Sequence, residues 1–140
     1  METAALRRDL IGSLQNVYHL EAFAALSELL QGESLVLTGL LSHQEGVVHP
    51  SDLSRELHLS RPRITAALSA LQRKGLIAMH RSPTDRRRIQ VSITEAGREI
   101  IGGRLVRMEA YFDKMLSGLG EADAQELIRL IDRCVEVMEA

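Results

Sequence analysis

The chain has 140 residues, of which 45% are apolar, so it can bury one substantial core and is expected to form a single domain over residues 1–140. No apolar run reaches the roughly 20 residues of a bilayer span, the first residues are too polar for a secretory signal, and the one cysteine excludes an intrachain disulfide, so we expect a cytoplasmic protein with no membrane partner. The formal net charge is −2, yet residues 51–90 hold nine Lys or Arg against three Asp or Glu, which leaves +6 on this segment and −8 on the remainder.

The first 32 residues are expected to form one long amphipathic helix. Apolar residues recur at three- and four-residue intervals from about Thr3 to Leu30, which is the period of one helix face. Gly32 would end this helix, because glycine is a poor helix former. A shorter apolar helix is predicted from about Glu33 to Ser42.

Two short helices separated by a tight turn are predicted next. Ser51 has the side chain of an N-cap for a helix over Asp52 to Leu57, and Ser60 caps the following helix after a turn at His58-Leu59. Gly75 suits the left-handed position that follows a helix. The second helix would bury an apolar stripe that consists of Ile64, Ala67 or Leu68, and Leu71.

A two-stranded ribbon follows the second short helix. Residues Leu76 to Arg81 and Arg88 to Ile93 read as paired strands, and the second strand alternates apolar with polar residues. The loop between them begins at Ser82 and leads to the run Asp85-Arg86-Arg87-Arg88. Val47-Val48-His49 is a possible short third strand.

Two more helices complete the chain. Thr94 caps a long helix from about Glu95 to Ser117, in which Gly102-Gly103 marks a weak point or bend, and a last helix runs from about Glu121 to Met138. The predicted fold class is therefore mainly α. A winged helix-turn-helix module over residues 33–94 is flanked by long dimerisation helices over residues 1–32 and 95–140.

The cationic module has the dimensions of a double-stranded DNA reader. The major groove admits an α-helix whose first residues meet base edges, and a basic ribbon tip can reach the adjacent minor groove or its phosphates. The residues predicted to lie in the major groove are Ser60, Arg61, Pro62, Arg63, Thr65, Ala66 and Ser69. Those predicted on the wing are Asp85, Arg86, Arg87 and Arg88, and those predicted on the DNA backbone are Ser51, Arg55, Arg73 and Lys74. Asp85 is expected to orient a neighbouring arginine, because a carboxylate facing DNA would be repelled.

The chain resembles the MarR family of bacterial transcriptional regulators. The resemblance rests on Leu71-Gln72-Arg73-Lys74-Gly75-Leu76-Ile77, then Asp85-Arg86-Arg87, then Ile93-Thr94-Glu95-Ala96-Gly97, in this order and at the family's usual spacing. It implies a homodimer whose terminal helices interlock and whose two modules read a palindrome, with binding changed by a small-molecule effector. It also implies that Arg61, Arg63 and Thr65 lie in the major groove and that Arg87, paired to Asp85, lies in the minor groove. Ala66, Ala70 and Pro62-Arg63 depart from the commoner residues of the family, so the operator sequence stays open.

Two kinds of ligand site are considered beside the DNA-binding surface. An effector pocket could be lined by Tyr18, His19, Phe23 and His43, although core packing explains the aromatic residues equally well. The resemblance raises a metal-responsive regulator, because some relatives sense zinc with His and Glu residues near the second helix and a pair of histidines on the fifth. His43 with Glu45 supplies half of such a site, but residues 95–117 contain no histidine, so this alternative is disfavoured. No metal or cofactor is therefore expected.

Two further alternatives concern Cys134 and the function class. Burial of Cys134 as a small apolar side chain is favoured over a redox role, because it falls on an apolar stripe.

A winged helix that binds proteins without binding DNA is the competing function, and the arginines of the module argue against it. An enzyme is rejected, because the module offers no nucleophile and base in a catalytic constellation.

Overall fold

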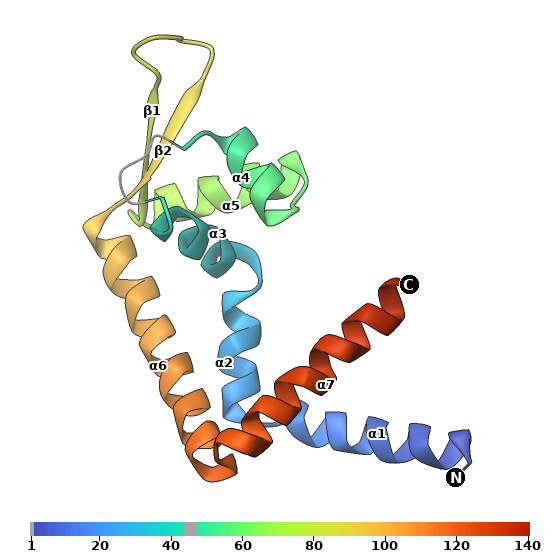
Figure 1. Cartoon of the computed structure of the whole chain (residues 1–140). Helices are drawn as coiled ribbons and strands as arrows, with labels where there is room; N and C mark the ends of the chain where they lie inside the picture. The colour runs from blue at the N-terminus through green and yellow to red at the C-terminus, as the bar shows by residue number, and fades with distance from the viewer. Residues whose placement is uncertain (1, 44–47) are drawn as a thin grey trace.

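The computed structural model describes residues 2–43 and 48–140, and over them the chain is mainly helical (Figure 1). The elements in chain order are α1 (Thr3–Tyr18), α2 (Glu21–Leu29), α3 (Gly32–Leu41), α4 (Pro50–Leu57), α5 (Arg61–Arg73), β1 (Ile77–Arg81), β2 (Ile89–Ile93), α6 (Glu95–Leu119) and α7 (Glu121–Glu139). The two strands pair antiparallel, from Ile77 opposite Ile93 to Arg81 opposite Ile89. The predicted fold class, mainly α with a two-stranded wing, is confirmed.

The elements divide into a compact end and an extended end. Helices α3, α4 and α5 lie with the ribbon at one end, and the tip of the ribbon points away from the other elements (Figure 1). Helices α2 and α6 extend side by side away from the compact end. Helices α1 and α7 join them at the end that lies farther from the wing. The first and last helices therefore lie far from the tip of the wing.

One apolar core holds the compact end together. It collects side chains from α3, α4, α5, the ribbon and α6, among them Leu37 and Ile101, which are fully buried. Ile64, Leu68 and Leu71 of α5 are also buried, so the predicted apolar stripe of this helix is confirmed. Each fully buried side chain of this size contributes about 1.5–3 kcal/mol to folding. The core fixes which face of α5 is left for solvent.

The single N-terminal helix predicted from Thr3 to Leu30 is wrong. The chain forms two helices, because Leu20 is extended and the N–H groups of His19 and Leu20 bond to carbonyls three residues back, which closes α1. The rings of Tyr18 and Phe23 lie against each other across this break, with centroids 5.7 Å apart. The break turns α2 onto α6, and α1 leaves in another direction. Gly32 was expected to end the helix; instead it is the first residue of α3, with φ +54°.

Helix α4 begins earlier than predicted. His49, rather than Ser51, is the N-cap, and Pro50 occupies the first helical position, where its missing N–H costs nothing. The backbone N–H of His49 donates to Asp52 Oδ2 at 3.0 Å, and this bond lowers the pKa of Asp52. The short third strand reduces to one bridge, in which Val91 N–H donates to the Val48 carbonyl at 2.7 Å. Val47 lies outside the described residues.

The other predicted helix ends agree with the structure. Ser60 Oγ accepts from the backbone N–H of Arg63 at 3.3 Å, and Thr94 Oγ1 accepts from that of Gly97 at 3.1 Å. Gly75 has φ +74° just beyond the end of α5, as predicted for a residue that follows a helix. Helix α6 continues through Gly102-Gly103 as one helix, so the expected weak point does not interrupt it.

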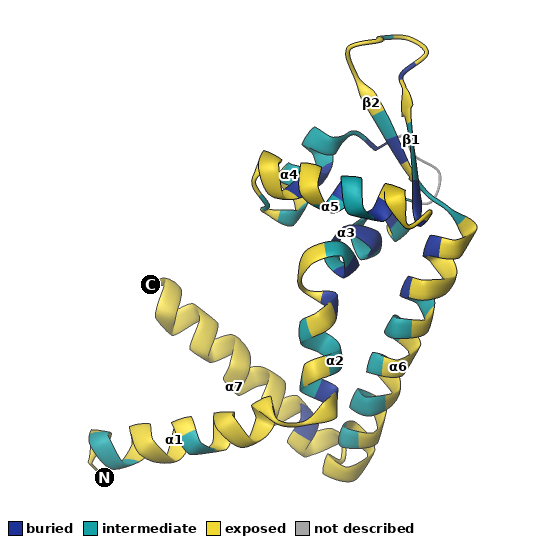
Figure 2. Cartoon of the chain, turned by 180° about the vertical axis from the view of Figure 1, so that it is seen from behind, coloured by how far each residue is buried: buried dark blue, intermediate teal, exposed yellow. Residues whose placement is uncertain are grey.

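The first and last helices have almost no packing partners in the single chain. Within the described part of the chain, α1 contains no buried residue and α7 contains one, Ala124 (Figure 2). Cys134 is exposed, so its predicted burial is wrong for the single chain: the apolar stripe of α7 on which it lies is uncovered. None of the helices described over 2–43 and 48–140 is long and apolar enough to cross a bilayer.

A three-bond joint ties the end of α5 to the start of α6. Thr94 donates twice, from Oγ1 to the Gly75 carbonyl at 2.8 Å and from its backbone N–H to the Leu76 carbonyl at 3.0 Å. The third bond is the cap from Gly97 N–H to Thr94 Oγ1. Gly97 is buried here, and a Cβ on it would overlap the Leu76 carbonyl oxygen and lie 2.8 Å from Cγ1 of Ile93. The close approach of the two backbones therefore requires glycine.

We predict that Gly97→Ala lowers the free energy of unfolding by about 1–3 kcal/mol or more, because the methyl group must displace backbone. The matched control is Gly103→Ala on the same helix, where an added Cβ meets nothing within 4 Å. That substitution should raise the free energy of unfolding by about 0.5–1 kcal/mol, the helix preference for alanine. Urea unfolding followed by circular dichroism measures both, and equal effects at the two positions would contradict the close packing at Gly97.

Candidate nucleic-acid interface

Helix α5 presents an outer edge of small side chains. With 3.6 residues per turn, Pro62, Ala66 and Ser69 lie opposite the buried Ile64 and Leu68. Pro62 and Ala66 are exposed and Ser69 is half-buried. The edge that leads away from the core therefore has little bulk and no charge, so a base edge can approach the helix closely.

The charged residues predicted for the major groove lie on the two flanks of α5. Arg61 and Thr65 border a hollow shared with the start of α4 and the loop end of the wing. Arg63, on the opposite flank, borders a larger hollow of about 660 Å³ beside α2 and α3. The seven predicted residues thus lie on one exposed surface, with an arginine on each side of the outer edge. Their contact with DNA stays a prediction.

The hollow beside Arg63 contains a network of paired charges that the sequence did not indicate. Lys74 Nζ lies 2.7 Å from Glu33 Oε1 on α3, so the lysine predicted for the DNA backbone is held by a carboxylate. Arg104 of α6 donates from Nη1 to Oγ of the buried Ser34 at 2.6 Å, and its Nε lies 3.4 Å from Glu28 Oε1. These contacts connect α5 and α6 to the α2–α3 corner. Arg104 and Ser34 are 70 residues apart, and no local pattern identifies such a pair.

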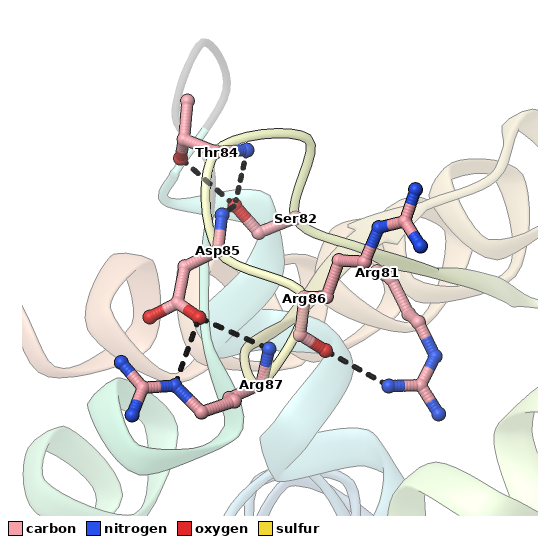
Figure 3. Close-up of polar contacts among 6 residues, drawn as sticks. All are labelled: Arg81, Ser82, Thr84, Asp85, Arg86 and Arg87. Carbon is pink, nitrogen blue, oxygen red and sulfur yellow. Dashed lines mark hydrogen bonds and ion pairs between the residues drawn. The ribbon is translucent and has the colours of Figure 1, made fainter.

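The tip of the wing is ordered by a buried serine (Figure 3). Ser82 Oγ accepts from the backbone N–H groups of Thr84 and Asp85, both at 3.3 Å, and Ser82 is only 4% exposed. Arg81 Nη1 donates to the Arg86 carbonyl at 2.8 Å, across the base of the loop. Neither Ser82 nor Arg81 was predicted as a functional residue; the Ser-Pro-Thr-Asp order, which favours a turn closed by a hydroxyl, is the signal that could have identified Ser82.

Asp85 orients Arg87, as predicted. One carboxylate oxygen, Oδ1, accepts from the Arg87 backbone N–H at 3.0 Å and from its Nε–H at 3.2 Å (Figure 3). The backbone bond and then the guanidinium bond lower the pKa of Asp85. The Arg87 side chain remains 91% exposed, so its outer N–H groups are available to a ligand.

The remaining residues predicted on the DNA backbone are spread around the module. Ser51 lies in the first turn of α4 and is half-buried, and Arg73 is exposed at the end of α5. Arg55 is exposed, but its Nη2 lies 3.0 Å from Asp52 Oδ1. The guanidinium group of Arg73 is therefore less restricted than that of Arg55, which is paired with Asp52.

The four residues predicted for an effector pocket do not come together. Tyr18, His19 and Phe23 cluster at the break between α1 and α2, where Tyr18 and Phe23 border a hollow of about 290 Å³. His43 lies at the end of α3, where its Nε2 donates to Glu56 Oε2 of α4 at 2.7 Å. His43 therefore belongs to the contact between α3 and α4, and the predicted set reduces to three residues.

A second hollow, of about 640 Å³, lies beside His19 against the end of α6. It is bordered by Tyr111, and a hydrogen bond with the Glu21 carboxylate raises the pKa of this tyrosine. The described residues contain no group of three side chains suited to hold a metal ion. Glu45, the partner considered for His43, lies outside them.

A short helix, a tight turn, a second helix and an arginine-tipped ribbon around one core define the winged helix-turn-helix class of proteins. The model of the MarR family matches residues 27–88. The regulator YpoP of Bacillus subtilis is 33% identical over 106 residues, which make up 76% of this chain and 74% of YpoP. The chain belongs to the MarR family.

Other relatives share the same description. YdgJ of Bacillus subtilis, named a transcriptional regulator of the helix-turn-helix type, is 29% identical over 79% of this chain, and PrsX of Escherichia coli is 30% identical over 71%. The matched segments cover 66% of YdgJ and 59% of PrsX, so the chain spans less than two thirds of these relatives.

Solved structures agree in fold over almost the whole chain. YusO of Bacillus subtilis superposes with a TM-score of 0.72 and 21% identity over 97% of this chain and 99% of YusO. A single-residue mutant of MepR from Staphylococcus aureus gives 0.71 and 18% identity over 99% of both chains.

We predict that the pKa of Asp85, followed by carbon-13 NMR of its carboxyl group, lies below the ordinary value of about 3.9. Because this pKa is lowered in the folded protein, the carboxylate stabilises the wing above the ordinary pKa, and the effect is lost as pH falls through the folded value. Arg87→Ala should raise the pKa only in part, since the backbone N–H is the larger cause. Arg86→Ala, which leaves both donors to Asp85 in place, should not change it; an Asp85 pKa at or above the ordinary value would contradict the pairing.

Proposed function

We propose that the chain is a sequence-specific DNA-binding transcriptional regulator that acts as a homodimer, represses from a palindromic operator and responds to a small-molecule effector. The observation that carries the proposal is the common exposed surface of α5 and the wing. Two guanidinium groups flank the outer edge of α5, and a third is held at the wing tip by Asp85. Arginines fixed on a helix and a ribbon are suited to base edges and phosphates in adjacent grooves.

Homodimer formation is supported by the apolar side chains of α1 and α7, which a partner would cover. The exposed side chains include Leu6, Leu10, Ile11, Leu14 and Val17 of α1, and Leu127, Ile128, Ile131, Val135 and Met138 of α7. An uncovered apolar surface of this extent marks an interface in a soluble protein. A second copy offers the same two stripes, which suits a two-fold symmetric contact. The two modules would then read half-sites about 10 base pairs apart.

The solved neighbours support both classes of partner. One MepR structure is described as bound to an oligodeoxyribonucleotide and another as bound to ethidium bromide, with TM-scores of 0.62 and 0.63 to this chain. PefR of Streptococcus agalactiae is described as a heme sensor in complex with heme. The ligands differ widely, so they support effector binding as a property and leave the chemical class of the effector open.

The break between α1 and α2 is the proposed effector region. Tyr18, His19 and Phe23 lie where the proposed dimer helices meet α2, and the two hollows bordered by these residues open beside them. An effector bound there would change the angle between α1 and α2 and hence the distance between the two wings. Such a change weakens binding to an operator of fixed half-site spacing.

We predict that Ile131→Arg converts the dimer to a single chain, because it places a charge in the centre of the α7 stripe. Light scattering after size exclusion should give the mass of two chains for the parent protein and of one for the variant, with helical circular dichroism retained. Gln125→Arg, on the polar side of the same helix, is the control and should stay dimeric. A parent protein with the mass of one chain would contradict the dimer.

We predict that Arg63→Ala costs about 1–3 kcal/mol on the best operator and relaxes the preference at one base pair. Arg87→Ala should weaken binding more evenly across sequences, because a wing arginine acts on groove shape and phosphates. Selection of bound DNA from a random pool supplies the operator, and fluorescence anisotropy measures affinity on specific and random duplexes. Arg129→Ala on α7 removes one charge far from the module and should leave both affinities unchanged. Equal losses on specific and random DNA for Arg63→Ala would remove its base-reading role, and no binding by the parent protein would leave the protein-interaction alternative.

A further inference from the structure

The loop end of the wing, the start of α4 and the first turn of α5 border a hollow of about 350 Å³. It lies on the flank of α5 opposite the charge network of Lys74 and Arg104. The residues that line this wing hollow are His49, Pro50, Ser51, Arg61, Thr65, Arg87, Arg88 and Ile89. Three separate parts of the chain therefore meet at one depression on the exposed surface of the module.

The wing hollow is strongly cationic. Arg61, Arg87 and Arg88 line it, and its described lining contains no Asp or Glu. Asp52 accepts from the His49 backbone and from Arg55, and Asp85 accepts from Arg87, so one of the three arginines is already paired. Guanidinium groups that converge bind an anion of matching shape, and a tetrahedral phosphate accepts two parallel N–H bonds from one arginine.

The hydrogen bond of the His49 ring determines which of its two nitrogens carries a proton. Its Nδ1 lies 2.8 Å from the carbonyl oxygen of Ile89, on the outer edge of β2. A carbonyl oxygen only accepts hydrogen bonds, so Nδ1 must carry the proton. Nε2 is then the ring nitrogen left for a ligand. It is an acceptor when the ring is neutral and a donor when the ring is protonated.

We propose that the wing hollow seats one phosphodiester of the DNA backbone, and that His49 makes DNA affinity depend on pH by donating from Nε2 to this phosphate when its ring is protonated. The inference rests on the proposed DNA binding. The hollow lies between α5, proposed for the major groove, and the wing, proposed for the minor groove, so the strand that separates the two grooves passes over it.

The charges around His49 are of both signs. Arg61 of α5 and Arg87 and Arg88 of the wing line the hollow with it, and Asp52 of α4 accepts from its backbone N–H. The arginines oppose a positive charge on the ring, and Asp52 favours it. A bound phosphate adds a negative charge beside Nε2, so binding of DNA and of one proton to each hollow become coupled. DNA affinity therefore rises as pH falls through the range in which imidazoles titrate.

Two substitutions of His49 distinguish its hydrogen bond to the wing from its uptake of a proton. In His49→Asn the side-chain amide nitrogen replaces Nδ1 and can still donate to the Ile89 carbonyl, asparagine is also a good N-cap for α4, and no titrating group remains. His49→Phe removes both the bond to Ile89 and the titration. His58→Asn is the matched control: it removes a histidine outside the hollow, at a residue with φ +54° that asparagine tolerates.

The experiment measures the affinity of the full chain for its selected operator between about pH 8 and pH 6, the range around the imidazole pKa. The parent protein and His58→Asn should gain roughly tenfold in affinity for each half-site as pH falls, the scale of one charged hydrogen bond. His49→Asn should stay near the affinity of the parent at high pH, with no gain. His49→Phe should be weaker than His49→Asn at every pH, because the bond from the side chain at position 49 to the Ile89 carbonyl is lost.

A scan of uncharged methylphosphonate linkages along the operator identifies the phosphate. One linkage in each half-site should abolish the pH dependence of the parent protein and have no such effect on His49→Asn. Survival of the parent's pH dependence in His49→Asn, or with a methylphosphonate at every linkage in turn, would overturn the phosphate seat while leaving DNA binding intact. Absence of binding by the parent protein at every pH would overturn the proposed function and this inference together.

Discussion

The geometry of the molecule depends on the joint at Thr94. At this joint the end of α5, the first residue of β1, the last residue of β2 and the start of α6 come together in space. Thr94 satisfies the carbonyl groups of the two residues before β1 and caps α6, and Gly97 allows the two backbones to touch. Helix α5, the wing and the long helix α6 are therefore fixed relative to one another by backbone contacts. A rotation of α6 must carry α5 and the wing with it.

The charges of the module lie on both flanks of α5. On the flank that faces α3, Lys74 is paired with Glu33, and Arg104 of α6 is paired with Glu28, so the module is connected to α2 and α3. On the flank that faces the wing, Arg61, Arg87 and Arg88 line a hollow without a carboxylate in its described lining, and Arg87 is paired with Asp85. The +6 charge of residues 51–90 therefore includes side chains that form ion pairs within the fold and others that line the exposed surface.

Features encoded by short sequence patterns were predictable. Ser60, Gly75 and Thr94 have the side chains that helix ends require, and the spacing of Ile64, Leu68 and Leu71 identifies the buried face of α5. The same period could not reveal the break at His19-Leu20. Both α1 and α2 have helical spacing, no Gly or Pro stands at the break, and the packing of α2 on α6, which the break accompanies, is a tertiary contact.

Contacts between distant residues were also beyond the sequence. His49 displaced Ser51 as the cap of α4 because the chain bends earlier, where His49 also reaches Ile89, 40 residues away. Local composition does not show that Glu33, 41 residues away, lies beside Lys74, and contact of Lys74 with the DNA backbone stays a prediction. His43 was separated from Tyr18 for a similar reason, since Glu56 of α4 holds it. In each case the missing information is the tertiary position of a polar partner.

The long helix α6 converts small changes at the uncovered end of the chain into larger movements of the wing. With 25 residues, α6 is roughly 37 Å long at 1.5 Å per residue, and a tilt of about 5° at one end moves the other by about 3 Å. The helices that lie at its far end, α1 and α7, are those with the fewest buried side chains, so their arrangement is set by whatever covers them. In the proposed dimer, a displacement of this size at each wing is comparable to the rise of one base pair per subunit. In that proposed dimer, a ligand that alters packing near the α1–α2 break would therefore change the half-site spacing without touching the residues proposed to face DNA.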